Sequence, residues 1–438
     1  MLNKDNIKYI LILALGFFSC SSIYLIQSLI LKNNSSVEFA NIVSVLYGSF
    51  SMTLGVLLFS ILFKKVKNIK LYYILFMILY LTSIIISFTI KNSILMSICL
   101  CLSCLFGPAG FMAGYHYSLI SSNIEMEYQG RIYSFGYALG SILTYLLTLM
   151  PNYVHNIISL IINILSILIT LYLVCNSQSL IKYQKEKYTI NLKKYLLIIS
   201  IIVISMATLT AISQDIIGFY TLNSKNNWFA NTRLHYSLGL IIGGIIYDKN
   251  QKIFDICLLI SFIYPLVSIV LLEQNISLFN ISAFSYFFLG FFSVFKALCF
   301  INLGVKNKHF ISIAAYGYMY ERIVEGTFML IQKIILDNYM LLIIIEAILF
   351  AIVLGLYLFF YLNNQTETDK IKNLAIKNSL SIQEEKVLRL MMKDLSNQEI
   401  ADSLFVSVNT IRNQVASIYK KTGMKKQELR ETFHYRTK

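Results

Sequence analysis

Long apolar runs separated by short polar breaks fill the chain from residue 8 to residue 362. There are twelve runs, and most reach the length of about 20 residues with which an α-helix crosses the hydrocarbon core of a bilayer. The pattern predicts an all-α fold in which residues 1–362 form a polytopic bundle of membrane spans. The expected spans are 8–30, 38–63, 71–90, 93–120, 132–150, 153–175, 195–221, 232–247, 254–273, 276–303, 310–336 and 339–362.

The polar break KYQKEKYTINLKK (182–194) is the longest between these runs, and it divides the twelve into six and six. We therefore expect two halves, 1–176 and 195–362. Composition agrees with a membrane protein, because 57% of the residues are hydrophobic, 13% are charged and the mean hydropathy is +0.67.

The two halves also resemble each other weakly at one place. SFGYALGSI (134–142) and AYGYMYERI (315–323) each open the fifth span of their half, which aligns Tyr137 with Tyr318. Repeated six-helix halves are common among transporter folds.

The distribution of Lys and Arg between the predicted spans indicates the orientation of the bundle. With the N-terminus inside, the inner loops carry 14 Lys and Arg residues and the outer loops carry four. Cytoplasmic loops are the ones enriched in these residues. We expect a multi-pass protein of the inner or plasma membrane with both termini in the cytoplasm.

The character of the chain changes after the last apolar run. Residues 363–379 are polar and are interpreted as a linker, and residues 380–438 have the periodicity of a small soluble helical domain. From residue 365 onward, 14 Lys and Arg residues face nine Asp and Glu residues. An excess of positive charge suits binding to nucleic acid.

Three helix starts are visible in this domain. Ser381 precedes Glu384 by three residues and Ser396 precedes Glu399 by three, which is the spacing of a capping box. Ser407 is expected to cap a third helix. A tight turn joins the second and third predicted helices, as in a helix-turn-helix motif.

The outward face of the third predicted helix carries polar groups that suit a DNA groove. Arg pairs with guanine edges and Asn with adenine edges in the major groove, while hydroxyl groups and Lys contact phosphates. The alternative is the solvated surface of a small helical bundle. The DNA-binding candidates are Ser407, Asn409, Thr410, Arg412, Asn413, Ser417, Lys420 and Lys421.

The segment LSIQEEKVLRLMMKDLSNQEIADSLFVSVNTIRNQVASIYKKTGM (380–424) resembles the LuxR-type helix-turn-helix domain. The family pattern is matched by Leu380, Ser381, Glu384, Ser396, Asn397, Glu399, Ile400, Ala401, Leu404, Val406, Ser407, Thr410, Ile411, Arg412, Ile418 and Lys421. The resemblance implies a four-helix domain that binds DNA, usually as a homodimer, and in which Thr410, Arg412, Asn413 and Lys421 occupy the positions that contact DNA. Asp394, Gln414 and Ala416 depart from the pattern, which leaves the target sequence open.

The membrane part carries a second resemblance. Gly244, Asp248, Lys249 and Lys252 resemble the cytoplasmic signature of the major facilitator superfamily, G-x-x-x-D followed by a basic residue. The corresponding loop of the first half, residues 60–70, keeps the basic charge but lacks the acid.

Ionisable residues within predicted spans are costly and are commonly functional. Lys296 lies in the tenth span, and Glu321, Arg322 and Glu325 lie in the eleventh, with Asp215 and Glu346 as further candidates. Two interpretations stay open for the first four residues: an ion pair that locks two helices, or part of a site for a small ligand.

The combination favours a membrane-anchored bacterial transcriptional regulator that senses an unknown small-molecule ligand, with DNA and membrane lipid as its other partners. The alternative is a facilitator-type transporter with an appended regulatory DNA-binding domain. An enzyme is disfavoured, because the sequence has no glycine-rich phosphate loop, metal-ligand cluster or nucleophile motif. We expect no cofactor and no metal.

Overall fold

The computed structural model of the 438-residue chain describes residues 4–34, 36, 39, 42–43, 45–63, 69–90, 92–121, 128–149, 152–175, 192–222, 228–274, 284–306, 313–335, 339–363, 371, 374–392, 395–404, 406–425 and 428–429. By internal contacts the chain divides into two compact units. The first comprises Met1–Gln184 and Ile199–Leu354, and the second comprises Lys185–Ile198 and Gly355–Lys438.

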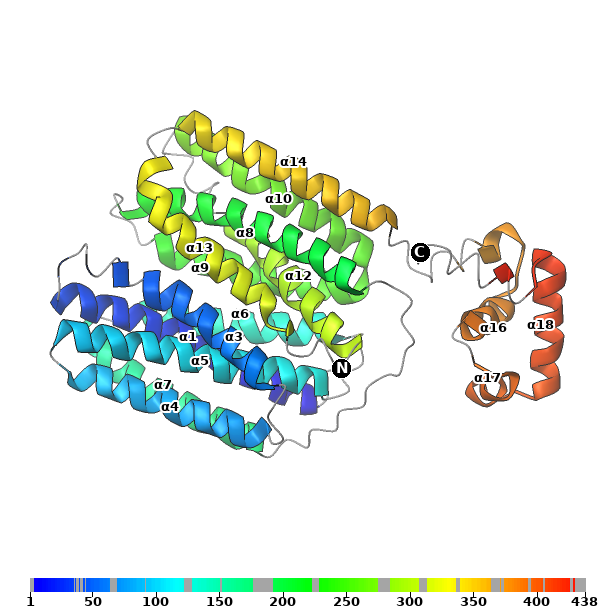
Figure 1. The fold of residues 1–438 in the computed structure, drawn as a ribbon, viewed down its shortest axis with the longest axis horizontal. Coiled ribbons are helices and arrows are strands. Elements are labelled where there is room, and N and C mark those ends of the chain that lie inside the picture. Colours follow the sequence, from blue (N-terminus) through cyan, green and yellow to red (C-terminus); the bar gives the residue numbers. More distant parts are fainter. Residues whose placement is uncertain are drawn as a thin grey trace. The chain divides into compact units, whose positions relative to one another are not determined.

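Long helices build the membrane-type part of the chain, in two groups that Figure 1 shows in blue to cyan and in green to yellow. The first half contains α1 (Lys4–Asn34), the π-helix η1 (Leu46–Ser51), α3 (Met52–Phe63), α4 (Ile69–Thr89), α5 (Ser93–Ser121), α6 (Gln129–Thr148) and α7 (Asn152–Cys175). The second half contains α8 (Leu192–Leu222), α9 (Trp228–Lys249), α10 (Gln251–Gln274), α12 (Ser285–Lys306), α13 (Tyr316–Ile335) and α14 (Tyr339–Asn363).

Each of the twelve expected spans overlaps a helix in the described part of the chain, when η1 and α3 are taken together. Two windows of the described residues are long and apolar enough to cross a membrane by length and composition, Ser93–Gly110 in α5 and Ser285–Leu303 in α12. Shorter apolar stretches occur in α1, α3, α4, α7, α8, α10 and α14. The charge-rich break at 182–191 lies outside the described residues.

The two halves meet mainly where α6 packs against α9 and where α13 packs against η1 and α3. At the first contact the backbones approach closely. A Cβ atom at Gly244 would lie 1.9 Å from Ser134 Oγ and 2.5 Å from the Gly130 carbonyl oxygen. Small residues allow such an approach between membrane helices.

The C-terminal domain contains α16 (Ile382–Met392), α17 (Asn397–Leu404) and α18 (Val408–Thr422). Both predicted capping boxes are confirmed. Ser381 Oγ accepts from Glu384 N at 3.2 Å while Glu384 Oε2 accepts from Ser381 N at 2.6 Å, and Ser396 and Glu399 exchange the same pair of bonds at 3.3 and 2.8 Å. These bonds satisfy amides that the first turn of a helix leaves without partners.

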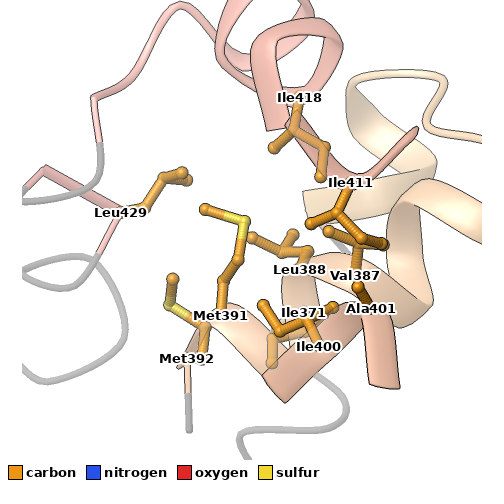
Figure 2. Close-up of a cluster of buried hydrophobic side chains, with 10 residues drawn as sticks. All are labelled: Ile371, Val387, Leu388, Met391, Met392, Ile400, Ala401, Ile411, Ile418 and Leu429. Atoms are coloured by element: carbon orange, nitrogen blue, oxygen red, sulfur yellow. The ribbon is translucent and has the colours of Figure 1, made fainter. Parts of the chain in front are cut away.

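An apolar core of its own holds this domain together, as Figure 2 shows. One of its members, Ile371, lies in the segment interpreted as a linker, and the partly buried Leu374 of the same segment packs against the core. Chain upstream of residue 380 therefore contributes to the domain. The buried residues are Ile371, Val387, Leu388, Met391, Met392, Ile400, Ala401, Ile411, Ile418 and Leu429. The expected fourth helix falls mostly outside the described residues.

Candidate DNA-reading helix and buried charge cluster

Helix α18 and its cap present seven of the eight predicted DNA-binding residues on the exposed side, whereas the eighth, Ser417, is half-buried. Ser407 caps its N-terminus, where Ser407 Oγ accepts from Thr410 N at 3.1 Å and lies 2.8 Å from Thr410 Oγ1. Ile411 and Ile418 point into the core and are fully buried. Because the apolar stripe orients the helix, the opposite face lies in solvent. Asn409, Thr410, Arg412, Asn413, Ala416, Lys420 and Lys421 are all exposed.

Two of the candidate residues also make contacts inside the domain. Ser417 Oγ donates to Glu384 Oε1, and Lys421 Nζ donates to Glu384 Oε2 at 2.7 Å. Lys421 Nζ also lies 3.4 Å from the carbonyl oxygen of Ser379. Helix α18 is thereby joined to the start of α16. The ammonium of Lys421 stays partly exposed, so a phosphate contact remains compatible with this pairing.

Glu384 is the centre of this network. Burial by itself raises the pKa of its carboxyl, but hydrogen bonds from Lys421, Ser417 and Ser381 outweigh that effect and lower the pKa to about 2. The carboxylate is therefore ionised at neutral pH and accepts from three donors at once. Sequence reasoning assigned Glu384 only the capping role.

The four predicted intramembrane residues form one network of charges. Lys296 Nζ, which is buried, contacts Glu321 Oε1. Arg322 Nη1 donates to Glu325 Oε2 at 2.6 Å, and Arg322 Nη2 lies 4.0 Å from Glu321 Oε2. Two cations and two carboxylates balance to zero, which is the arrangement that makes buried charges tolerable. The side chain of Asp215 lies outside the described residues.

The ammonium of Lys296 lies beside two aromatic rings of the second half. It lies 5.2 Å from the ring centroid of Tyr318 and 5.5 Å from that of Phe292. Tyr318 stacks on Tyr137 with ring centroids 5.6 Å apart, and its hydroxyl contacts that of Tyr133. Tyr137 and Tyr318 are the residues aligned by the sequence repeat, so the two equivalent positions meet between the halves.

A second polar contact joins the halves at the signature residue Asp248. Its carboxylate accepts from Gly130 N at 2.7 Å, from Arg131 N at 3.0 Å and from Arg131 Nε at 2.8 Å. Residue Tyr128, which precedes α6, makes no side-chain cap, so Asp248 of α9 caps α6 from the other half. Arg131, which directly precedes the expected fifth span, is therefore paired with this acid.

Comparison with protein families identifies the C-terminal part. Residues 378–429 match the family model described as bacterial regulatory proteins, luxR family. The match covers the three helices described above and their caps. A search of curated proteins finds no match to the chain.

Solved structures match the remainder of the chain in fold. The human organic anion transporter MFSD10 (TETRAN) matches with a TM-score of 0.60 and 9% identity, over 82% of this chain and all of that one. The major facilitator superfamily transporter FucP in its outward conformation matches with a TM-score of 0.57 and 14% identity, over 80% and 98%. At these identities the likeness establishes the fold alone. The chain therefore joins a LuxR-type helix-turn-helix domain at residues 378–429 to a helical domain with the major-facilitator fold.

Proposed function

We propose that the protein is a membrane-anchored transcriptional regulator, in which a bundle of twelve spans senses a small ligand and a cytoplasmic domain binds DNA. The observation that carries this proposal is the presence of a LuxR-type domain and a major-facilitator fold in one chain. The LuxR-type domain supports transcription regulation through DNA. The second fold supports insertion in a bilayer, because its helices are apolar on surfaces that water would otherwise contact.

The exposed side of α18 supports the role of DNA-reading helix. Arg412 and Asn413 are exposed and suited to base edges, and Thr410 and Lys420 are suited to phosphates. On two half-sites one helical turn apart, a homodimer would place two copies of α18 in successive major grooves.

Sensing requires that the bundle has two states with different affinity for the ligand. The two contacts between the halves, Asp248 with the start of α6 and Tyr137 with Tyr318, are the places where such states would differ. The ligand would bias one state, and residues 363–379 would transmit the bias to the DNA-binding domain.

Full-length protein in lipid nanodiscs provides the test, with DNA flanking its own coding region as the probe. Arg412→Ala is expected to weaken binding by roughly 5- to 150-fold, since one bidentate base contact contributes ~1–3 kcal/mol. Lys386→Ala, which removes an exposed charge from α16, is the matched control and is expected to change affinity little. Unchanged affinity and base preference in Arg412→Ala would show that α18 does not read the DNA.

Transport is the second candidate function, and the buried Lys296–Glu321 pair favours it because charged groups inside spans often mark a ligand path. Uptake into vesicles of a compound that shifts DNA binding would support transport. Glu321→Gln and Lys296→Met are each expected to abolish that uptake. If the ion pair is purely structural, each single variant is expected to be less stable than wild type instead of losing uptake. The double variant is then expected to be more stable than either single variant.

A further inference from the structure

Helix α14 carries one charged residue in its 25 positions, Glu346, and this residue faces the protein interior. Its side chain is fully buried, with 0% of its surface exposed. Val353, one heptad further on and therefore on the same side of the helix, is also fully buried. The neighbouring Ala347 and Ile348 are exposed on the opposite side, where lipid is expected.

Within the described part of the chain, neither carboxyl oxygen of Glu346 has a hydrogen-bond partner. Among the residues that the structure describes, none provides a charge or a hydrogen bond that acts on this carboxyl. An ionised carboxylate without a partner in an apolar interior costs many kcal/mol, and such a group takes up a proton instead. A carboxylic acid at the same place is neutral and costs only the desolvation of a polar group.

Glu321 provides the contrast within the same bundle. It is buried to a similar degree, at 5% exposure, but its carboxylate contacts Lys296 and lies near Arg322. Cations stabilise the ionised form of a buried acid. The two glutamates therefore differ in partner and not in depth of burial.

We propose that Glu346 is a proton-binding site of the membrane domain, holding an exchangeable proton in the conformation described here. This inference rests on the proposed membrane location but not on DNA binding or on a ligand. A bundle state that brought Glu346 to water would release the proton. Proton binding would therefore favour the bundle state in which Glu346 is buried. Protons would act as a second ligand, so that a lower pH would shift the bundle toward that state.

Infrared spectroscopy of the full-length protein in lipid nanodiscs at pH 7 tests this inference. A protonated carboxyl has a C=O stretching band separate from the bands of a carboxylate. The difference spectrum between wild type and Glu346→Gln is expected to show loss of one acid band. Glu321→Gln is the matched control, because this similarly buried glutamate contacts Lys296, and it is expected to leave that acid band in place.

Transfer into D₂O is expected to shift the Glu346 band, which shows that the proton exchanges with solvent. An unshifted band would overturn the claim of exchange, and a spectrum without an acid band assignable to Glu346 would overturn the site. If Glu346→Gln does not fold, Glu346→Asp is expected to move the band instead of removing it. Because the measurement involves no DNA, its failure is distinguishable from failure of the regulator proposal.

Discussion

The carboxylate of Glu384 has two structural roles in the C-terminal domain. Glu384 closes the capping box of α16 and also holds α18 through Ser417 and Lys421. The orientation of α18, the proposed DNA-reading helix, therefore depends on a residue that does not belong to it. Glu384 is accordingly a positioning residue, and its effect is measurable as stability.

Glu384→Gln is expected to destabilise the C-terminal domain by ~1–3 kcal/mol, since three donors lose a charged acceptor. The measurement is denaturant unfolding of residues 365–438 followed by circular dichroism. Glu385→Gln is the control, because Glu385 forms a partly exposed i,i+4 pair with Arg389 that is worth at most ~0.5 kcal/mol. Equal effects of the two variants would contradict the role of Glu384.

The pKa of Glu384 gives the pH dependence of the same stability. Its folded-state pKa of about 2 lies below the unfolded value of about 4.3, so its contribution is complete above the unfolded value. That contribution is expected to be lost as the pH falls from roughly 4 to 2. Stability curves of wild type and Glu384→Gln should converge over this interval; a constant difference would refute the assignment.

At the scale of elements, backbone conformation at helix ends decides stability independently of side-chain contacts. Gly423 ends α18 in the left-handed region with φ of 68°, and its amide donates to Tyr419 O. Ser379 adopts a similar φ of 52° before α16, although it carries a Cβ. Glycine tolerates this conformation at position 423, whereas the serine at position 379 is strained by it.

Opposite effects are therefore expected for two substitutions. Gly423→Ala should destabilise the domain by ~1 kcal/mol, because an L-residue is strained at this φ while no atom crowds the new Cβ. Ser379→Gly should stabilise it by ~0.5 kcal/mol after the entropy of the unfolded chain is counted. Thermal unfolding of both variants measures this, and the same sign for both would contradict the explanation.

The contact between α6 and α9 is the second element-scale feature. Asp248→Ala removes the acceptor for both amides at the start of α6 and for the Arg131 guanidinium. The α6–α9 distance distribution, measured with paired spin labels in nanodiscs, is expected to broaden. Lys249→Ala, at an exposed neighbouring position, should leave it unchanged; broadening in both variants would mean that the effect is not specific to the cap.

At the scale of the whole molecule, the proposed function depends on the side of the membrane on which the DNA-binding domain lies. The excess of Lys and Arg in the predicted inner loops predicts that both termini lie in the cytoplasm. A reporter fused after Lys438 that is active only in the cytoplasm is expected to be active. A reporter active only outside the cytoplasm is the control fusion, and its activity would contradict the regulator proposal.

Much of this protein follows from local pattern alone. Apolar run length predicted the helices, because backbone groups in an apolar environment must be satisfied within the segment. The Ser–Glu spacings predicted two capping boxes of the C-terminal domain, since a capping box is formed by residues three apart. Ser407 was likewise expected to cap the third helix, and it does so by accepting from Thr410 N. Residue type and helical period likewise predicted the exposed face of α18, except at Ser417, which is half-buried and donates to Glu384.

Contacts between distant parts of the sequence were decided only by tertiary structure. Asp248 and Arg131 are 117 residues apart in the sequence, and Glu384 and Lys421 are 37 residues apart. The π-helix η1 was likewise not predicted from the sequence. The sequence places ionisable residues at Lys296, Glu321 and Glu346 alike, but packing pairs the first two and gives the third no partner among the residues that the structure describes. Local pattern determines which ionisable residues lie in apolar helices, but the neighbours that they contact come from distant parts of the chain and are decided only by packing.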